Sequence, residues 1–381
     1  MKSLVGRSPA VAAIALVLLA TEPAAATSPV SFAPYQAYPV GSRAESVAIA
    51  DVTADGLPDV LLTASYGFSD PSNNFRLFVF PQMPDGTLGT PVKYATDGQY
   101  SDPMGVDTGD LNGDGRADVA VATTSGIDVF YQAAGGGLLP PELIVTSNQA
   151  IATVVADVNV DGQQDIVTNT RDGLLLLEQD SGAFASHLVT TDLQWEVEVA
   201  DLTGDGLPDI AGCGGDGQCR PIVNVFEQRA SGKFRLSQYP GDAGIWAACG
   251  IGVGDVSGDG LGDVVMSICA NQPYARLNVF VQRRGKLRPP VVYDSYDLPK
   301  PVTVADMNGD NLADVVTLHG EWLRAGVYLQ ESGILGAESL FPLPPSDYGL
   351  KGLAVDDLNN DGKPDVAIAD HNSGLVVLRQ Q

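Results

Sequence analysis

Seven copies of one nine-residue segment carry most of the chemistry that this sequence offers. The first copy, DVTADGLPD, runs from Asp51 to Asp59. All copies share the pattern Asp-x-(Asn/Thr/Ser)-x-Asp-Gly-x-x-Asp, except that Asn311 replaces the glycine in one of them. Oxygen-bearing residues at positions 1, 3, 5 and 9, with a turn residue at position 6, describe a loop that wraps a calcium ion. The sequence therefore predicts up to seven structural Ca²⁺ ions, one for each copy.

Each predicted ion takes four side-chain ligands and one backbone carbonyl. Position 1 supplies the carboxylates of Asp51, Asp110, Asp157, Asp201, Asp255, Asp306 and Asp357. Position 3 supplies neutral oxygens from Thr53, Asn112, Asn159, Thr203, Ser257, Asn308 and Asn359. Position 5 supplies the carboxylates of Asp55, Asp114, Asp161, Asp205, Asp259, Asp310 and Asp361. Position 7 supplies the carbonyls of Leu57, Arg116, Gln163, Leu207, Leu261, Leu312 and Lys363. Position 9 supplies the carboxylates of Asp59, Asp118, Asp165, Asp209, Asp263, Asp314 and Asp365.

An EF-hand, a magnesium site and a plain Asx-turn all fit the loop less well than a calcium site. An EF-hand needs Glu at position 12 and a following helix, but position 12 in the first copy is Leu62 and the sequence after it is strand-like. Magnesium keeps its waters and avoids cages made only of protein. A single copy would be equally consistent with an Asx-turn, whereas seven aligned copies favour calcium. Asn311 is a mild exception because Asn tolerates a left-handed backbone.

The segments around each loop read as β-strands. An alternating run precedes the first loop (46–50), a β-branched run follows it (59–65), and two further runs complete the unit (75–82 and 91–96). Four strands per unit of about 50 residues, seven times over, predict a β-propeller. The last unit ends after its third strand, and residues 31–40 resemble a fourth strand without a blade. We therefore expect an all-β, seven-bladed propeller of four-stranded blades whose N-terminal strand completes the last blade.

The loops give the chain a resemblance to a known family. It resembles the FG-GAP/VCBS repeat family, the calcium-binding propellers also found in the heads of integrin α-subunits, over residues 31–381. The resemblance implies seven blades, Ca²⁺ at the aspartates, calcium loops on the bottom face, and irregular links on the top face. Those irregular links are 65–74, 97–103, 212–220, 241–250 and 269–276. The resemblance does not imply integrin function.

The net charge limits the partners that we expect, and the N-terminal sequence predicts the cellular location. The formal net charge is −26, which disfavours nucleic acid and anionic membranes as partners. The loops hold 3 × 7 = 21 of the 47 Asp and Glu residues, and seven Ca²⁺ would return 7 × 2 = 14 positive charges. Lys2 and Arg7, the apolar run 11–20 and Ala24–Ala26 read as a signal peptide over residues 1–26. We expect a single propeller domain over 27–381 that is secreted or periplasmic, monomeric and not inserted in a membrane.

The four cysteines are predicted to form two disulfides in an exported chain. Three connectivities are possible, and we favour Cys213–Cys219 and Cys249–Cys269. Cys213 and Cys219 share one top-face link, and Cys249 and Cys269 flank the top ends of two adjacent strands. A zinc site is disfavoured because no Cys-x-x-Cys pair exists.

The top face and the channel hold the remaining candidates for function. Aromatic residues near the top could stack on sugar or peptide, or could simply pack the loops down: Tyr66, Phe68, Tyr100, Trp195 and Trp246. Positions three and five residues before each loop should line the channel, where most residues are small. Asp107, Glu196 and Glu198 break that pattern, either as a hydrated acidic lining or as a site for an ion or basic ligand. His319 and His371 are expected in top loops, as exposed histidines rather than a catalytic cluster.

Three hypotheses for function remain from the sequence. The first is an exported, calcium-stabilised recognition or adhesion module that binds glycan or protein through its top face. The second is a polysaccharide-active enzyme, such as a lyase, although no known catalytic motif is present. The third is a purely structural or assembly component. The sequence identifies no catalytic residue and does not identify the ligand.

Overall fold

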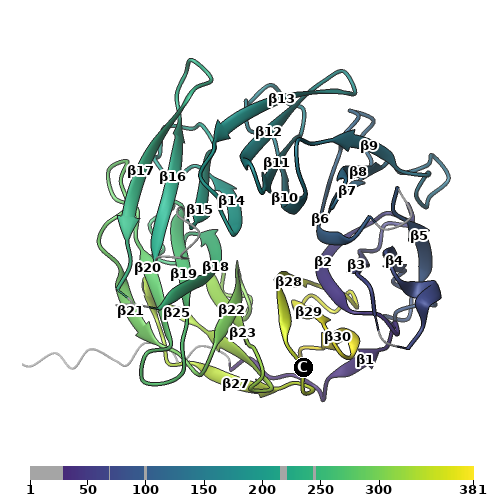
Figure 1. Cartoon of the computed structure of the whole chain (residues 1–381). Helices are drawn as coiled ribbons and strands as arrows, with labels where there is room; N and C mark the ends of the chain where they lie inside the picture. The colour runs from purple at the N-terminus through teal and green to yellow at the C-terminus, as the bar shows by residue number, and fades with distance from the viewer. Residues whose placement is uncertain (1–28, 68, 98–100, 215–220, 243–245) are drawn as a thin grey trace, which may run out of the picture.

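A ring of seven β-sheets forms the described part of the chain. The computed structural model describes residues 29–67, 69–97, 101–214, 221–242 and 246–381. Within those residues the strands form seven four-stranded antiparallel sheets and one two-stranded hairpin. Figure 1 shows the sheets arranged as blades around a central axis. The predicted seven-bladed propeller is therefore confirmed.

The strands of each blade run from the innermost to the outermost in chain order. Blade 1 comprises β2 (Ala44–Ala50), β3 (Asp59–Ala64), β4 (Arg76–Phe80) and β5 (Val92–Ala95). Blade 2 comprises β6 (Pro103–Gly109), β7 (Asp118–Thr123), β8 (Gly126–Phe130) and β9 (Glu142–Val145). Blade 3 comprises β10 (Ala150–Ala156), β11 (Asp165–Thr170), β12 (Gly173–Asp180) and β13 (Ala183–Thr190). Blade 4 comprises β14 (Glu196–Ala200), β15 (Asp209–Cys213), β16 (Ile222–Gln228) and β17 (Phe234–Pro240).

The last three blades follow the same plan with two departures. Blade 5 comprises β18 (Ala247–Gly254), β19 (Asp263–Cys269), β20 (Arg276–Phe280) and β21 (Val291–Asp294). Blade 6 comprises β22 (Pro299–Ala305), β23 (Asp314–His319), β24 (Arg324–Tyr328) and β27 (Ser339–Pro342), with the hairpin β25 (Gln330–Glu331) and β26 (Ile334–Leu335) inserted. Blade 7 comprises β28 (Tyr348–Asp356), β29 (Asp365–Asp370), β30 (Gly374–Leu378) and β1 (Gln36–Tyr38). One 3-10 helix, η1 (Pro71–Asn73), lies in the link between β3 and β4.

The N-terminal strand closes the ring, as predicted. Ala37 of β1 pairs with Val376 of β30, and Phe32 forms a further bridge with Gln380. Figure 1 shows the purple β1 beside the yellow β30. Closure removes the free sheet edge that β30 would otherwise expose.

The hydrophobic core is divided among the contacts between blades. Seven clusters of buried residues occur in the described chain, and each joins two neighbouring blades. The residue at position 2 of every nine-residue loop is apolar, almost fully buried, and belongs to the cluster shared with the next blade. These residues are Val52, Leu111, Val158, Leu202, Val256, Met307 and Leu358. The loops therefore help to pack the ring as well as connect strands.

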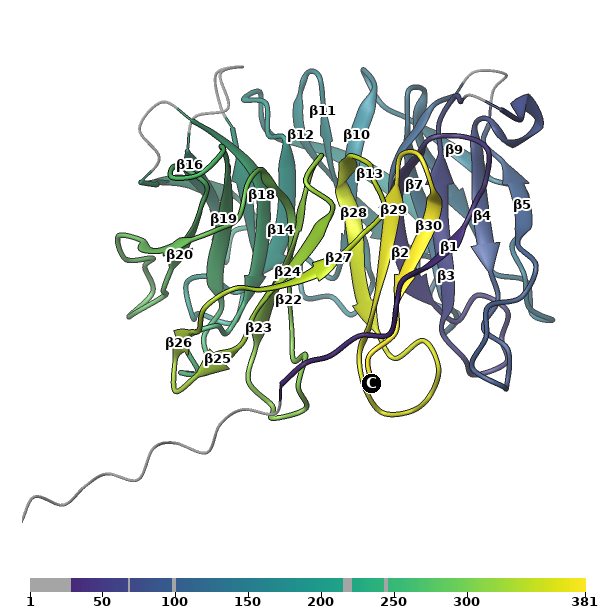
Figure 2. The same ribbon diagram turned by 90° about the horizontal axis from the view of Figure 1, so that it is seen from below.

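The two faces and the wall of the ring differ in character. The nine-residue loops join the first and second strands of each blade at one edge of the ring, which we call the bottom face (Figure 2). The links between the third and fourth strands lie at the same edge, whereas the links between the second and third strands and the links between blades lie at the opposite edge, the top face. No helix in the described residues is long and apolar enough to cross a membrane.

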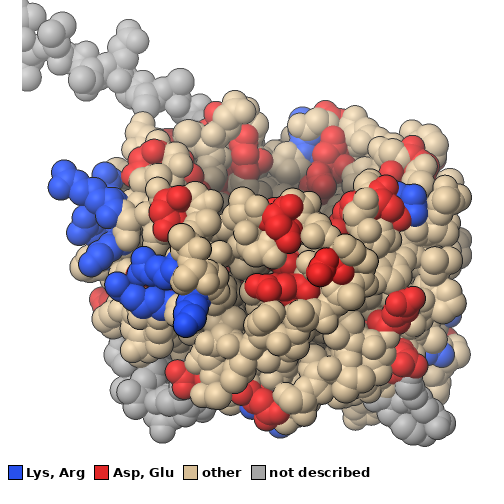
Figure 3. Space-filling model, turned by 90° about the horizontal axis from the view of Figure 1, so that it is seen from above, with Lys and Arg blue, Asp and Glu red and all other residues tan. Residues whose placement is uncertain are grey.

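Lys and Arg gather in one cluster on the wall shown in Figure 3. Segments 229–235 and 283–288 alone carry seven of the 21 Lys and Arg residues. Because of this local cluster, the negative net charge alone does not exclude nucleic acid as a partner. The absence of nucleic-acid binding stays a prediction.

Removing residues 29–38 should open the ring. The edge of β30 loses its partner, and Phe32 and Tyr38 leave the clusters against which they pack. We expect the melting temperature to fall by roughly 10 °C, for a loss of about 3–5 kcal/mol, and dimers to appear in size-exclusion chromatography. A synthetic peptide of residues 29–40 added in trans should reverse both effects. A truncated protein with an unchanged melting curve would show that β1 does not close the ring.

Candidate functional site

The seven nine-residue loops adopt one backbone conformation. Position 6 has a positive φ of 64° to 87° in every copy, including Asn311 at 64°. Position 4 also has a positive φ, between 59° and 76°. Gly occupies position 4 in four copies, while Ala54 and Val160 adopt this left-handed conformation despite their side chains. The expectation that Asn311 preserves the loop is confirmed, and the second left-handed position is a feature that the sequence pattern did not reveal.

Side chains within each loop hold this conformation. In every copy the position-1 aspartate accepts a hydrogen bond from the backbone N–H of position 6, at 2.7 to 2.9 Å. The position-5 aspartate accepts one from the N–H of position 7, at 2.8 to 3.2 Å. These bonds gather the oxygens of positions 1 and 5 within one tight turn.

The position-9 aspartates have a structural role of their own. All seven are 0 % exposed. One carboxylate oxygen of each accepts the N–H of a glutamine at the end of the third strand of the same blade or just after it, at 2.7 to 3.0 Å. In six copies the carboxylate also accepts an N–H from position 2 or 3 of its own loop. Each of these aspartates therefore ties its loop to the third strand of the blade.

The loop oxygens suit a hard cation in type, although they do not form an acidic cluster. No group of three or more His, Cys, Asp or Glu side chains in the described chain is close enough to hold a metal ion. The predicted ligand set also includes Asn, Thr or Ser oxygens and a backbone carbonyl, which suit Ca²⁺. Because each carboxylate oxygen has two lone pairs, the aspartates at positions 1 and 5 keep acceptor capacity beyond the hydrogen bonds described. Calcium binding stays a prediction.

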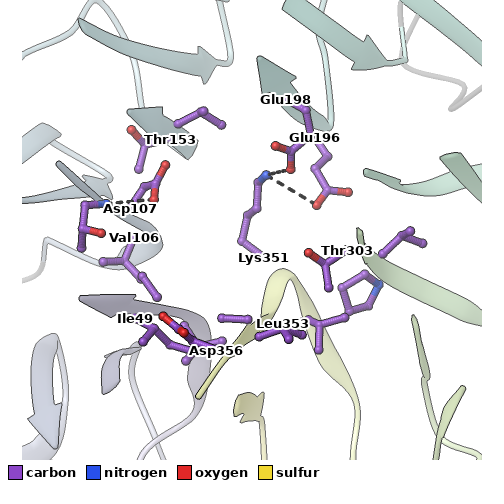
Figure 4. A pocket seen from close by; sticks show the side chains of 18 residues that line it. Ile49, Val106, Asp107, Thr153, Glu196, Glu198, Thr303, Lys351, Leu353 and Asp356 are labelled. Carbon is purple, nitrogen blue, oxygen red and sulfur yellow. Dashed lines mark hydrogen bonds and ion pairs between the residues drawn. The ribbon is translucent and has the colours of Figure 1, made fainter. Parts of the chain in front are cut away.

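The central channel contains a cavity of about 280 Å³ that is crossed by one lysine. Lys351 of β28 reaches from blade 7 to blade 4, where it pairs with Glu198 and donates to the carbonyl of Val197 at 3.0 Å. Its Nζ also lies 3.9 Å from Glu196. Figure 4 shows Lys351 directed at both glutamates across the channel. Asp107, Glu196 and Glu198 line the cavity as predicted, but no sequence pattern indicated their lysine partner.

Two of the channel acids cap the edges of neighbouring sheets. Asp107 of blade 2 accepts the N–H of Val155 in blade 3, at 2.8 Å. Glu196 of blade 4 accepts the N–H of Ile251 in blade 5, at 2.9 Å. The innermost strand of a blade is a sheet edge whose N–H groups need acceptors when buried. Each of these acids therefore joins two blades, which favours a lining role over a free acidic site.

Close contact between the inner strands of adjacent blades also explains why those strands carry small residues. A Cβ on Gly105 would meet Ala152 of the next blade, and one on Gly250 would collide with the carbonyl of Lys300. Inner strands of adjacent blades converge toward the axis, so these positions need glycine for close approach.

Burial shapes the charge state of the channel. It raises the pKa of Glu196 to about 8, although nearby Lys351 acts in the opposite direction. It raises the pKa of Asp107 to about 6, against the hydrogen bonds that the carboxylate accepts. Burial alone would lower the pKa of Lys351, but Glu198 and Glu196 outweigh it and raise that pKa. Near neutral pH the cavity therefore contains a charged lysine, and Glu196 is largely protonated.

Exposed aromatic rings gather on the top-face links. Trp246 and Tyr274 in blade 5 are 37 % and 53 % exposed, and their ring centroids lie 5.7 Å apart with planes at 31°. The disulfide Cys249–Cys269, which confirms that predicted pairing, joins the two strands next to these rings. The bridge therefore braces the segments that present both rings.

The structure describes some of the other residues predicted for the top face, and others lie outside the described residues. Tyr66 is 66 % exposed and Trp195 is 37 % exposed, both in top-face links. Phe68, Tyr100 and Cys219 lie outside the described residues. Cys213 is buried at the end of β15, and its pairing with Cys219 stays a prediction. Trp322 was not predicted from the sequence; it is 42 % exposed in the link after β23 and packs edge-on against Tyr296.

The expectation of exposed histidines is wrong for His319. This residue ends β23, is 0 % exposed, and contacts Glu338 and the carbonyl of Asp297 at 2.7 and 3.0 Å. His371 does lie in a top-face link, but burial lowers its pKa to about 4, and Arg43 acts in the same direction. Neither histidine is the exposed loop residue that was expected, because neighbouring blades cover both.

Polar residues that no motif marks surround the top of the channel. Glu45 accepts from Ser65 at 2.6 Å, pairs with Arg43 at 3.2 Å, and lies 3.7 Å from His371. Glu45 and Lys351 both line a small cavity of about 50 Å³ near the channel. None of these residues belongs to a repeated motif, and their proximity depends on ring closure.

A comparison with family models identifies the repeats. The FG-GAP-like repeat model matches residues 51–121, 110–168 and 201–266. Together with the seven loops, these matches show that the chain belongs to the FG-GAP-like repeat family. No curated protein sequence matched the chain.

Solved structures share the fold with low sequence identity. A structure of BBS1N in complex with ARL6DN is 12 % identical, with a TM-score of 0.64 over 92 % of this chain and 96 % of that one. A lectin from Agrocybe aegerita that recognises non-reducing terminal N-acetylglucosamine is 21 % identical, with a TM-score of 0.58 over 80 % and 81 %. Virginiamycin B lyase from Staphylococcus aureus is 10 % identical, with a TM-score of 0.61 over 92 % and 99 %. These likenesses concern the fold alone.

The Glu196→Gln variant should remove a pH-dependent cost of folding. The folded protein raises the pKa of Glu196 from 4.5 to about 8, so stability from its protonated form is lost as pH rises through that interval. Gln keeps an acceptor for Ile251. We expect similar melting temperatures at pH 5 and a variant roughly 3–8 °C more stable at pH 8.5, by differential scanning fluorimetry.

Glu198→Gln is the matched control for this experiment. It removes the closest partner of Lys351 and should lower the melting temperature at both pH values. A Glu196→Gln variant with the pH dependence of the parent would contradict a buried, protonated Glu196.

Proposed function

We propose that this protein is an exported, calcium-stabilised recognition module that binds glycan or protein through its top face. One observation carries the proposal. All three tryptophans of the chain lie in top-face links, and each is 37 % to 42 % exposed. Tryptophan is enriched at binding interfaces, and its flat ring stacks well on sugar and peptide surfaces.

Preorganisation of these rings supports a binding role. The Cys249–Cys269 bridge braces Trp246 and Tyr274, and Trp322 packs edge-on against Tyr296, with ring centroids 6.3 Å apart. Rings held in place before binding lose less conformational entropy when a ligand arrives. The Agrocybe aegerita lectin shares this fold, which makes glycan a reasonable ligand class to test first.

Calcium and export form the second part of the proposal. Seven loops share one conformation, and they present oxygen ligands of the types that Ca²⁺ prefers. Bound ions would offset the repulsion among loop carboxylates and fix each turn at the base of its blade. A disulfide is compatible with an extracellular or periplasmic setting. Because the chain closes its own ring, we also propose that it acts as a monomer.

Removal of calcium should destabilise the protein. We expect EDTA to lower the melting temperature by at least about 5 °C, because ions that bind only the folded state stabilise it by mass action. Isothermal titration of the stripped protein should show up to seven sites. Asp55→Ala should reduce the count by one, whereas Asp192→Asn, an exposed position outside the loops, should not. A melting curve unaffected by EDTA would overturn the calcium proposal.

Trp246→Ala should weaken ligand binding at the top face. Hits from a glycan array and from a panel of extracellular proteins, each screened with Ca²⁺, provide the ligands. Loss of a stacked ring costs about 1.4 kcal/mol or more, so affinity should fall roughly tenfold. Val145→Ala on the outer wall, where Val145 is 75 % exposed, should leave affinity unchanged. Equal affinity in the Trp246 and Val145 variants would contradict binding at this part of the top face.

A further inference from the structure

The outer wall contains a cavity of about 480 Å³ between blades 5 and 6. Residues 293–296, at the end of β21 and just beyond it, form one side. Tyr328 at the end of β24, residues 335–338 and Leu340 form the other side, together with Gln272. The cavity is distinct from the channel and from Trp246 and Tyr274, and it shares Tyr296 with the contact that holds Trp322. Its volume falls in the range of small-molecule sites.

Blade 6 departs from its sister blades at a position next to the Glu338 carboxylate of this cavity. Four residues before the glutamine after the third strand, the seven blades carry Phe78, Asp128, Leu175, Asn224, Asn278, Gly326 and Val376. In blades 2 and 5 that side chain accepts a backbone N–H from the preceding blade, from Asp97 at 2.8 Å and from Asp242 at 2.9 Å. Gly326 offers no such acceptor.

Glu338 supplies the missing acceptor from an adjacent segment. It takes the N–H of Tyr296 at 2.7 Å. A Cβ on Gly326 would collide with the Glu338 carboxylate and contact His319. The glycine therefore makes room for a buried carboxylate whose side chain is only 9 % exposed. The same blade carries Tyr328 where other blades have Phe or Leu, which adds a hydroxyl at the cavity.

The buried pair Glu338–His319 carries no net charge. Nδ1 of His319 faces the carbonyl of Asp297, which can only accept, so this nitrogen holds a proton. Nε2 faces Glu338, so one more proton is shared between the two side chains. Whichever partner holds that proton, the charges of the pair sum to zero. Among the described residues, no Lys or Arg lines the cavity.

The polar groups of the cavity favour a ligand that donates hydrogen bonds. Glu338 and the Tyr328 hydroxyl, which itself donates to the carbonyl of Asp294, keep lone pairs available. The hydroxyl of Ser295 is buried beside the hydroxyl of Tyr328. Tyr293, Tyr296 and Leu335 supply apolar and aromatic surface beside these groups.

We propose that this cavity binds a neutral, polyhydroxylated ligand of the size of one sugar ring. Hydroxyl groups can donate to Glu338 and Tyr328 and pair with Ser295, while the faces of the ring lie against the tyrosines and leucine. An anion meets no Lys or Arg among the described lining residues. An ammonium ion meets Glu338, which is paired with His319, and Asp294, whose carboxylate lies 3.7 Å from the guanidinium of Arg276. The site does not involve Trp246 or Tyr274, and the proposal stands whether or not those rings bind a ligand.

Saturation-transfer NMR with defined probes tests the proposal. The probes are the methyl glycosides of glucose, galactose, mannose and N-acetylglucosamine, with choline as a cationic probe. We expect transfer to at least one glycoside, with affinity in the millimolar range typical of single small ligands, about 4 kcal/mol, and none to choline. Transfer to choline but to no glycoside, or to none of the five probes, would overturn the proposal.

Two variants locate the binding site. Ala337→Trp fills the cavity from an exposed position and should reduce glycoside affinity more than tenfold without lowering the melting temperature. Glu338→Gln keeps an acceptor for Tyr296 and should also weaken binding. Trp246→Ala, on the top face, should leave it unchanged. Glycoside binding that survives Ala337→Trp, or that is lost in Trp246→Ala alone, would overturn the assignment to this cavity.

Discussion

The hydrogen bonds to the seven buried position-9 aspartates are the interaction on which the blades depend. Each carboxylate accepts a backbone N–H from the end of the third strand or just after it, and six of the seven also accept one from their own loop. An unsatisfied buried N–H costs about 1–3 kcal/mol, so the loss of one aspartate exposes a blade to a penalty at two points. The loop is thus part of the sheet's hydrogen bonding before any ion is considered.

Closure of the ring imposes a second constraint, which acts on the innermost strands at the axis. The innermost strands converge there, so glycine is required where one strand faces another, and the exposed N–H groups of each strand need acceptors. Asp107 and Glu196 satisfy that need between blades. Lys351 then balances the acids that gather in the channel. The acidic channel follows from sheet edges that meet, and does not by itself indicate a binding site.

The candidates for function lie where the repeat is least regular. The scaffold fixes the bottom face and the channel, whereas the top-face links and the wall of blade 6 vary from blade to blade. Trp246 and Tyr274 are presented by a disulfide-braced pair of strands, and Gly326 makes room for the Glu338 carboxylate that lines the wall cavity. Loops and irregular segments placed on a rigid scaffold commonly carry recognition.

The sequence by itself determined the blade count, the place of the closing strand, the loop conformation at Asn311 and the Cys249–Cys269 bridge. Each follows from a local pattern repeated at a regular interval, or from strand ends that are close in the chain. Only the tertiary structure decided that Lys351 meets Glu198, 153 residues away, that His319 is buried against Glu338, and that Trp322 joins the exposed aromatics. Such contacts arise when the ring closes and brings blades together, so no local periodicity could have indicated them.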